Sequence, residues 1–413
     1  MMTETIDIST PLSLSGGIEI KNRLYKSAMS EQLGDSRHNP GVELARLYKT
    51  WAQVGIGISI IGNVLIDRNA LGEPKNVVLD EQSDLEQFRD WAEAASQNNT
   101  HVWMQLNHPG KQSPNFLSKT PVAPSAVPLE VDIKSVFNLP RALTEPEIFD
   151  IITKFATSAR LAKETGFSGV QIHCAHGYLL NQFLSPFHNR RKDDWGGSLE
   201  NRMRMLVEVY RAIREKVGAD YPVGLKLNSS DFKSGGFTAE ESQAVALTMQ
   251  NEGIDLLEIS GGTYENPRMT GEKTGSALSE REAYFIEYAD TIRKELTIPL
   301  VVTGGFRSQK AMNRALASGV TDMIGLARPL AIEPDFPNKL LTLPDYASAV
   351  QRPSTGIAIL DYAAMLDITW YEMQLYRIGR GKPADPKLGA WRTVFQTFWR
   401  SGAHMFKQRR ARS

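Results

Sequence analysis

Two histidines and a tyrosine lie within six residues of one another. They are His173, His176 and Tyr178, in the segment QIHCAHGY that begins at Gln171. Two neutral imidazoles make a good pair of hydrogen-bond donors to a carbonyl or nitro oxygen. A phenol beside them can deliver a proton. The segment therefore predicts a site that polarises an oxygen-bearing group of a substrate and protonates the substrate nearby.

The same histidines allow two other interpretations, a metal site and polar side chains satisfied within a loop. His173 and His176 have the i, i+3 spacing found in some metal sites, but no carboxylate at a matching offset completes a triad. Cys174 is the single cysteine of the chain, which excludes a four-cysteine zinc site and an iron–sulfur cluster. We therefore expect no metal, and we expect Cys174 to be a small buried residue rather than a redox thiol.

Two glycine-containing turns could hold a phosphate. Gly304 and Gly305 follow one strand-like run, and Ala327 and Arg328 follow the next. Glycine lets backbone N–H groups approach an anion closely, and an arginine offers that anion a bidentate partner. A tight turn between a strand and a helix would use the same glycines. The pairing of the two turns with Arg328 favours the phosphate site.

Three more polar residues lie where strand-like runs should end, namely Ser30, Gln105 and Lys226. A single glutamine or lysine in a strand usually marks a sheet edge or a salt bridge. Three such residues around one site, beside a phosphate, suggest instead a flat polar cofactor with a phosphate tail.

Eight short apolar and β-branched runs must position these residues, and helical patterns lie between most of the runs. Eight parallel strands with intervening helices predict an α/β fold of the (β/α)8 TIM-barrel type, whose sites form at the C-terminal ends of the strands. The predicted strands are 23–29, 57–62, 102–106, 169–174, 223–227, 256–260, 300–303 and 322–326.

Helix starts are marked by capping motifs. Ser198 is expected to be an N-cap, and four capping boxes pair a serine or threonine with a glutamate three residues later. The four boxes are Ser83 with Glu86, Thr144 with Glu147, Thr238 with Glu241 and Ser279 with Glu282.

The chain beyond the eighth predicted strand must form an extension. We expect a catalytic barrel domain over residues 1–340 and a C-terminal helical extension over residues 341–413. The last part of that extension, from residue 391 onward, has six basic residues and no acidic one, and Trp391, Phe395, Phe398 and Trp399 fall on one helical face. We expect a helix docked on the barrel and a solvated tail, with weak contact to an anionic membrane surface as the alternative.

Composition limits the classes of function. Of the 413 residues, 41% are hydrophobic and 23% are charged, which is ordinary for a soluble globular enzyme. Lys+Arg and Asp+Glu both number 47, so no global basic field drives nucleic-acid binding. The N-terminus lacks the apolar core of a signal peptide, and the longest apolar run is too short for the roughly 20 residues that span a bilayer. We therefore expect a cytoplasmic protein.

The longest specific motif is HGYLLxxFLSP, which begins at His176 and is followed by NxRxD from Asn189 and GGSxENR from Gly196. Supporting motifs are NR at 22–23, SAM at 27–29, QLxHxG at 105–110 and the two glycine-containing turns. On these motifs the chain resembles the old yellow enzyme family of FMN-dependent ene-reductases, from about Lys21 to about Pro334.

The resemblance implies a role for each site residue. The residues implied to bind FMN are Ala28, Met29, Ser30, Gly62, Gln105, Lys226, Gly304, Gly305, Ala327 and Arg328. Those implied to bind the substrate are His173, His176, Asn107 and Tyr264. Tyr178 is implied to protonate the carbon α to the activating group, and Lys226 to lie near flavin N1 and O2.

Lys226 carries a further expectation. The alternation of the fifth predicted strand puts Lys226 on the same side as Gly224 and Asn228, and a lysine inside a barrel is costly unless it meets an anion. The resemblance offers one anion there, the N1–O2 region of a reduced flavin. The alternative is that Lys226 points outward to a carboxylate on a helix.

Four positions depart from the usual pattern of the family. Ala28 stands where proline is frequent, Ser30 where threonine or cysteine is frequent, Lys226 where arginine is usual, and Trp195 where tyrosine is usual. A lysine is a point charge and lacks the planar fork of an arginine. These changes leave the fold expectation unaltered and leave the flavin potential and the preferred oxidant open.

The resemblance implies an NAD(P)H oxidoreductase that reduces activated C=C bonds in enones, enals and nitroalkenes, with NADH or NADPH as reductant. Hydride would come from flavin N5 and a proton from the tyrosine. One alternative is a flavin-dependent amine-type dehydrogenase of the same superfamily. Another is a non-catalytic flavin-binding barrel recruited to a membrane or a partner by the basic tail. The sequence does not separate NADH from NADPH, or a monomer from a homo-oligomer.

Overall fold

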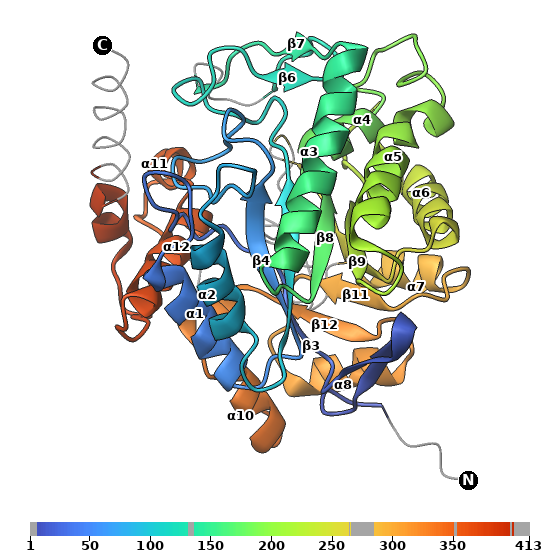
Figure 1. Ribbon diagram of the computed structural model, residues 1–413. Helices are drawn as coiled ribbons and strands as arrows, with labels where there is room; N and C mark the ends of the chain where they lie inside the picture. The colour runs from blue at the N-terminus through green and yellow to red at the C-terminus, as the bar shows by residue number, and fades with distance from the viewer. Residues whose placement is uncertain are drawn as a thin grey trace.

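Eight parallel strands close into a barrel in the computed structural model, which describes residues 6–130, 136–263, 265, 285–350, 353–396 and 399 (Figure 1). The order around the barrel is β10, β11, β12, β3, β4, β5, β8 and β9. The strands are β3 (Leu24–Lys26), β4 (Ile58–Leu65), β5 (His101–Asn107), β8 (Gly169–Cys174), β9 (Val223–Asn228), β10 (Leu256–Ser260), β11 (Leu300–Thr303) and β12 (Met323–Leu326). Each coincides with one predicted run, so the predicted TIM barrel is confirmed.

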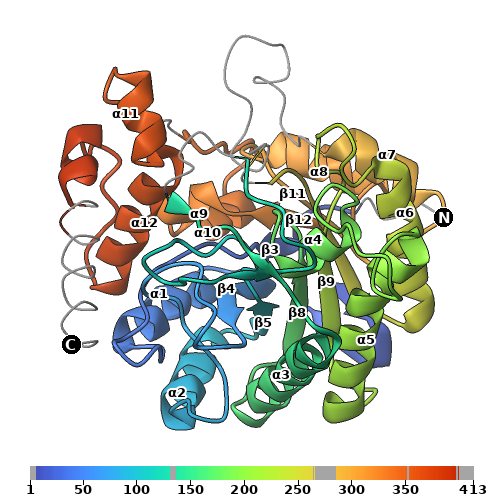
Figure 2. The same ribbon diagram turned by 90° about the horizontal axis from the view of Figure 1, so that it is seen from above.

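Helices form a ring outside the strands, as the view along the barrel shows (Figure 2). The long ones are α1 (Val42–Gln53), α2 (Leu85–Ala95), α3 (Glu145–Glu164), α5 (Leu199–Val217), α6 (Ala239–Glu252), α7 (Ile286–Arg293) and α8 (Gln309–Ala317). Two short helices, α4 (Leu179–Leu184) and α9 (Arg328–Ile332), begin directly after predicted site residues.

Two of the four predicted capping boxes, and the predicted N-cap at Ser198, are present in the structure. Thr144 and Thr238 form the predicted capping boxes, and the Ser198 hydroxyl accepts a hydrogen bond from the Asn201 backbone N–H. The box at Ser83 is wrong, because α2 begins at Leu85 with Asp84 as its N-cap. The Ser83 hydroxyl instead closes a turn by donating to Val78 O at 2.9 Å. The box from Ser279 to Glu282 lies outside the described residues.

The barrel interior is apolar near the N-terminal ends of the strands, and this end of the barrel is closed. An N-terminal hairpin of β1 (Leu12–Leu14) and β2 (Ile18–Ile20), joined by the turn η1 (Ser15–Gly17), covers that end. One buried cluster joins the hairpin to inward-facing strand residues, namely Leu12, Leu14, Ile20, Tyr25, Ile58, Ile60, Trp103, Leu256, Val301 and Met323. The opposite end of the barrel, where the strands end, is left for polar side chains.

The long connection between β5 and α3 covers part of that polar end. It contains a small parallel pair, β6 (Val122–Ala123) and β7 (Arg141–Ala142), which lies at the top of Figure 1.

The chain after the eighth strand continues as α10 (Phe336–Thr342), α11 (Ala358–Ala363) and α12 (Leu366–Gly379). Helix α12 packs beside α1 (Figure 2), and the Arg46 guanidinium donates to Gly379 O at 3.0 Å. The Gln32 amide also donates to both oxygens of Glu372, at 2.9 Å each. The extension is thereby tied to the loop that follows β3.

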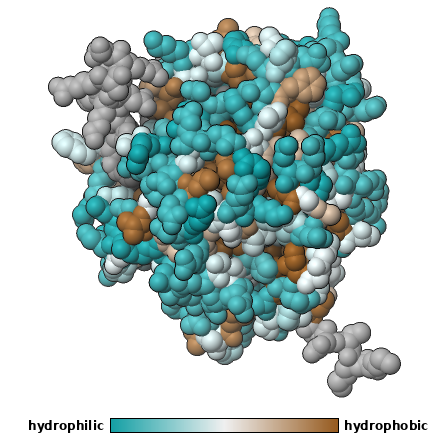
Figure 3. All heavy atoms as spheres, in the orientation of Figure 1, coloured by the Kyte–Doolittle hydropathy of each residue, from teal (hydrophilic) through white to brown (hydrophobic). Residues whose placement is uncertain are grey.

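Residues 390–396 form a further helix, of which Thr393 and Val394 are buried. Trp391, Phe395 and Trp399 are 48%, 71% and 82% exposed, so these three aromatic side chains do not make the docking contact. Phe398 and residues 400–413 lie outside the described residues. Over the face in Figure 3, hydrophobic residues are otherwise scattered among hydrophilic ones. Within the described ranges, no helix is long and apolar enough to cross a membrane.

Candidate active site

The predicted polar residues meet at the C-terminal end of the barrel because the strand registers align them. Gln105 pairs with Gln171 between β5 and β8, and His173 pairs with Lys226 between β8 and β9. Lys226 in turn pairs with Glu258 between β9 and β10. Paired residues of neighbouring parallel strands point to the same side, and here that side is the barrel interior.

His173 contacts both His176 and Tyr178. The rings of His173 and His176 lie 5.2 Å apart between centroids at an interplanar angle of 86°. The rings of His173 and Tyr178 lie 4.9 Å apart at 73°. The structure thus brings together the three side chains that the sequence singled out.

His176 is held in an unusual backbone conformation. Its φ is +60°, in the left-handed region that non-glycine residues seldom adopt, and it precedes Gly177 at φ +78°. Three contacts hold it: its N–H donates to Asn228 Oδ1 at 3.1 Å, its carbonyl accepts from Gln112 Nε2 at 3.1 Å, and its Nε2 lies 2.8 Å from Ser260 Oγ. Strain held by several contacts is typical of a functional position.

Both imidazoles are neutral at physiological pH. Burial lowers the pKa of His173 well below its usual value, and the neighbouring His176 and Lys226 lower it further. Burial and then Lys226 lower the pKa of His176 in the same way. A neutral imidazole keeps one N–H donor, which it can offer to an oxygen of a substrate.

Several residues at this end of the barrel have buried polar atoms without partners in the described structure. Among them are His173, at Nδ1, and Asn107, the last residue of β5, at both amide atoms. An unsatisfied buried group costs about 1–3 kcal/mol. These atoms therefore fit a bound molecule that carries both hydrogen-bond donors and acceptors.

A buried network lies beneath the histidines, and sequence analysis missed its centre, Glu258. The carboxylate accepts hydrogen bonds from Tyr25 at 3.1 Å, Gln171 at 2.8 Å and Thr303 at 2.8 Å. Gln171 Oε1 also accepts from Gln105 Nε2 at 2.7 Å. We call Glu258 and these partners, with Lys226, the Glu258 network.

The expectation that a flavin supplies the one anion for Lys226 is wrong. Lys226 Nζ lies 3.0 Å from Glu258 Oε1 inside the barrel, with both side chains buried. Lys226 does face the interior, as the alternation predicted. The carboxylate was overlooked because a single glutamate in the apolar run of β10 gives no sign of its partner, which the strand register supplies.

The loop after β3 approaches β4 very closely at Gly62. A Cβ at that position would lie 1.6 Å from the backbone oxygen of Met29, so no larger residue fits without movement. The Gly62 N–H donates to the Tyr48 hydroxyl at 2.9 Å. Ala28, Met29 and Ser30 stay partly exposed, and the Ser30 hydroxyl donates to the Glu73 carboxylate.

Buried charges that sequence analysis did not single out support this loop. Lys26 Nζ donates to Ile60 O at 2.8 Å and lies 3.9 Å from the Glu31 carboxylate. Burial lowers the pKa of Lys26 to about 8 and raises that of Glu31 to about 7.

The two glycine-containing turns lie at the ends of neighbouring strands, β11 and β12. Gly304 and Gly305 have φ values of +118° and +93°, which only glycine adopts readily. Both are partly exposed, as are Ala327 and Arg328 at the start of α9. A partly exposed glycine turn beside an arginine fits a phosphate group.

Tyr264, which was predicted to bind the substrate, lies outside the described residues. Over the residues that are described, no group of three or more His, Cys, Asp and Glu side chains is arranged to hold a metal ion. Cys174 is free and fully buried, and burial raises the pKa of its thiol well above the usual value.

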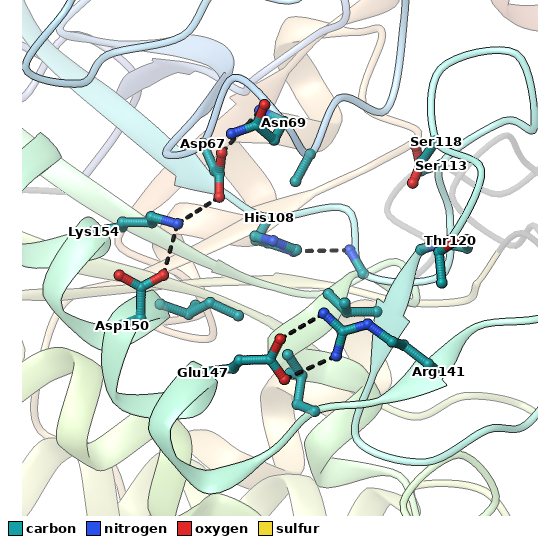
Figure 4. Close-up of a pocket in the computed structure, with 16 residues that line it drawn as sticks. Asp67, Asn69, His108, Ser113, Ser118, Thr120, Arg141, Glu147, Asp150 and Lys154 are labelled. Atoms are coloured by element: carbon teal, nitrogen blue, oxygen red, sulfur yellow. Dashed lines mark hydrogen bonds and ion pairs between the residues drawn. The ribbon is translucent and has the colours of Figure 1, made fainter.

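A separate cavity of about 290 Å³ lies between the loops after β4 and β5 and the first turns of α3 (Figure 4). Its charged side chains already bind one another. Lys154 lies 2.7 Å from both Asp67 and Asp150, and Arg141 pairs with Glu147. These ion pairs tie α3 to the loop after β4, so we assign the cavity a structural role.

Comparison with known proteins gives one consistent result. Residues 7–342 match the family described as NADH:flavin oxidoreductase / NADH oxidase. The chain is 37% identical over 391 residues to the NADH-dependent flavin oxidoreductase iliE of Neonectria sp. (strain DH2), a match that covers 88% of this chain and 51% of that protein. The chain thus spans about half the length of that relative.

Two further similarities cover most of both chains. The NADH-dependent flavin oxidoreductase iccE of Talaromyces variabilis is 37% identical over 366 residues, covering 82% of this chain and 87% of that protein. The solved structure of the old yellow enzyme homologue from Zymomonas mobilis has a TM-score of 0.70 at 25% identity, covering 83% of this chain and 94% of that one.

Proposed function

The chain belongs to the NADH:flavin oxidoreductase / NADH oxidase family, and from that premise we propose that it is an FMN-dependent NAD(P)H oxidoreductase that reduces electron-poor C=C bonds. The proposed substrates are enones, enals and nitroalkenes. The observation that carries the proposal is the contact group of His173, His176 and Tyr178 at the end of β8, which joins two neutral donors to one phenol.

The residues that would hold FMN surround this group. Gly304, Gly305, Ala327 and Arg328 would bind its phosphate. The residues proposed to contact the ring are Ala28, Met29, Ser30, Gly62, Gln105 and Lys226. When bound, FMN supplies hydride transfer between NAD(P)H and the substrate.

The protein's own groups prepare the substrate. His173 and His176 donate hydrogen bonds to the carbonyl or nitro oxygen, which draws electron density away from the β-carbon. Asn107 and Tyr264 contact the rest of the substrate. Tyr178 delivers a proton to the α-carbon, and the phenol recovers its proton from solvent. The partly exposed His176 leaves this group accessible to a small molecule.

An anaerobic titration tests the proposal. The purified protein should be yellow and release FMN, NADH or NADPH should bleach the flavin, and 2-cyclohexenone should restore the colour. A colourless protein without flavin affinity would contradict the proposal. Bleaching by an amine but not by NAD(P)H would favour the amine-type dehydrogenase. A flavin that neither reductant bleaches would favour the non-catalytic flavin-binding barrel.

A further inference from the structure

The Glu258 carboxylate is an unusual group to find inside a barrel. Its side chain is 0% exposed, and each of its two oxygens has two donors. Oε1 faces Lys226 Nζ at 3.0 Å and Thr303 Oγ1 at 2.8 Å. Oε2 faces Gln171 Nε2 at 2.8 Å and Tyr25 OH at 3.1 Å. The four donors come from four different strands, so the closed barrel itself fixes the carboxylate.

This arrangement favours an ionised carboxylate. Each oxygen faces one group that can only donate, the Lys226 ammonium at Oε1 and the Gln171 amide N–H at Oε2. Burial alone would raise the pKa of Glu258. Lys226 and the hydrogen bonds from Gln171 and Thr303 outweigh burial and hold that pKa below its usual value.

The negative charge of an ionised Glu258 reduces the electrostatic effect of Lys226 on its surroundings. The ammonium and the carboxylate lie 3.0 Å apart, so the carboxylate offsets part of the ammonium's charge for groups near the pair. Lys26, another buried lysine of the described chain, has a carboxylate of its own in Glu31. Lys226 therefore offers hydrogen-bond donors to its surroundings with less positive charge than an unpaired lysine would.

We propose that Glu258 is a positioning residue that holds the Lys226 ammonium in place and offsets its charge, which keeps the reduction potential of the bound flavin low. This inference rests on the proposed function, because it places Lys226 beside the flavin. An uncompensated cation at that position would stabilise the anionic reduced flavin and raise its potential. A flavin of lower potential is a stronger hydride donor to the substrate.

The test is the midpoint potential of the Glu258→Gln variant. Glutamine has nearly the same shape and removes the charge, so the potential should rise. We expect at least a tenfold increase in the equilibrium constant for reduction, which is about 30 mV for a two-electron couple. An unchanged or lower potential would overturn the inference.

Two further variants separate charge from structure. Glu258→Asp keeps the charge and should return the potential toward the wild-type value. Adding Lys226→Met to Glu258→Gln removes the cation as well and should bring the potential back down. A double variant that stays as high as Glu258→Gln would overturn the inference, since the rise would then have another origin than the Lys226 charge.

A measurement on the FMN-free protein keeps this inference distinct from the proposed function. Carbon-13 NMR should show an ionised Glu258 carboxyl at neutral pH, assigned by its loss in Glu258→Asp. A protonated carboxyl would overturn the inference even if the protein is an active reductase. An ionised carboxyl in a protein that binds no flavin would uphold the charge pair and contradict the proposed function alone.

Discussion

In the proposed reaction the imidazoles and the phenol act on different atoms of the substrate. His173 and His176 bind the oxygen of the activating group, and Tyr178 protonates the α-carbon. The two imidazoles are kept neutral by burial, so they act as donors. The phenol lies against His173 with its ring centroid 4.9 Å away, close enough to serve the same small substrate. Each role can be removed without the other, and two predictions follow at this scale.

Tyr178→Phe should leave flavin reduction by NAD(P)H unchanged and slow the reoxidation of the flavin by an enone. General acid catalysis of this kind contributes about 10²–10⁴-fold to the rate. Stopped-flow measurement of the two half-reactions checks the split, with the partly exposed Tyr376→Phe as the control for loss of a phenol. Two unchanged half-reactions would remove Tyr178 from the mechanism.

Replacing both His173 and His176 with alanine should weaken the binding of phenols. A phenolate resembles the polarised oxygen of the substrate and should accept hydrogen bonds from both imidazoles. Their loss should cost more than about 1–3 kcal/mol of binding free energy. A spectral titration with p-nitrophenol measures it, and His101→Ala, at the N-terminal end of β5, is the control. Unchanged affinity, or one metal ion per chain, would favour a metal site instead.

At the scale of elements, the loop after β3 and the strand β4 are fitted to each other at Gly62. Gly62→Ala should cost at least about 1–3 kcal/mol of stability, because the added methyl group would overlap the Met29 backbone. It should also weaken FMN binding, since the loop carries proposed ring contacts. Gly389→Ala is the matched control, because nothing lies within 4 Å of its Cβ position. Equal thermal stability of the two variants would show that the loop can move aside.

The elements themselves were predictable from the sequence. Buried parallel strands appear as short apolar runs, and each of the eight runs became a barrel strand. Thr144 and Thr238 marked helix starts because their capping boxes act within four residues. The capping box predicted at Ser83 was wrong because the Ser83 hydroxyl donates to Val78 O in a local turn.

The side-chain contacts between different strands could not be predicted from the sequence in the same way. The contact of Lys226 with Glu258 depends on the register of β9 against β10, and that of Gln105 with Gln171 depends on β5 against β8. No local pattern encodes those registers. The convergence of His173, His176 and Tyr178 was predictable because the three lie in one short segment.

At the scale of the whole molecule, the C-terminal extension carries a surface that the barrel does not use. Its last described helix docks through Thr393 and Val394 and turns Trp391, Phe395 and Trp399 outward. The stretch from residue 391 to the end has six basic residues and no acidic one. Exposed aromatic residues beside basic ones are typical of segments that bind anionic lipid surfaces.

Contact with a membrane surface therefore stays a prediction with a direct test. The protein should co-sediment with phosphatidylserine vesicles and much less with phosphatidylcholine vesicles. Changing Trp391, Phe395 and Trp399 to alanine should reduce binding about tenfold or more, because burying one large side chain is worth about 1.5–3 kcal/mol. Leu139→Ala, at an exposed position elsewhere, is the control. Equal sedimentation with both lipids would contradict the prediction.

The central claim concerns the reaction, and an anaerobic mass balance tests it most directly. The protein is supplied with NADH or NADPH and 2-cyclohexenone without oxygen, and both the oxidised nucleotide and cyclohexanone are quantified. We predict one molecule of saturated ketone for each nucleotide oxidised, with the carbonyl group intact. Nucleotide oxidation that requires oxygen and yields no ketone, or reduction of the carbonyl to an alcohol, would contradict the assignment of this chain as a reductase of activated C=C bonds.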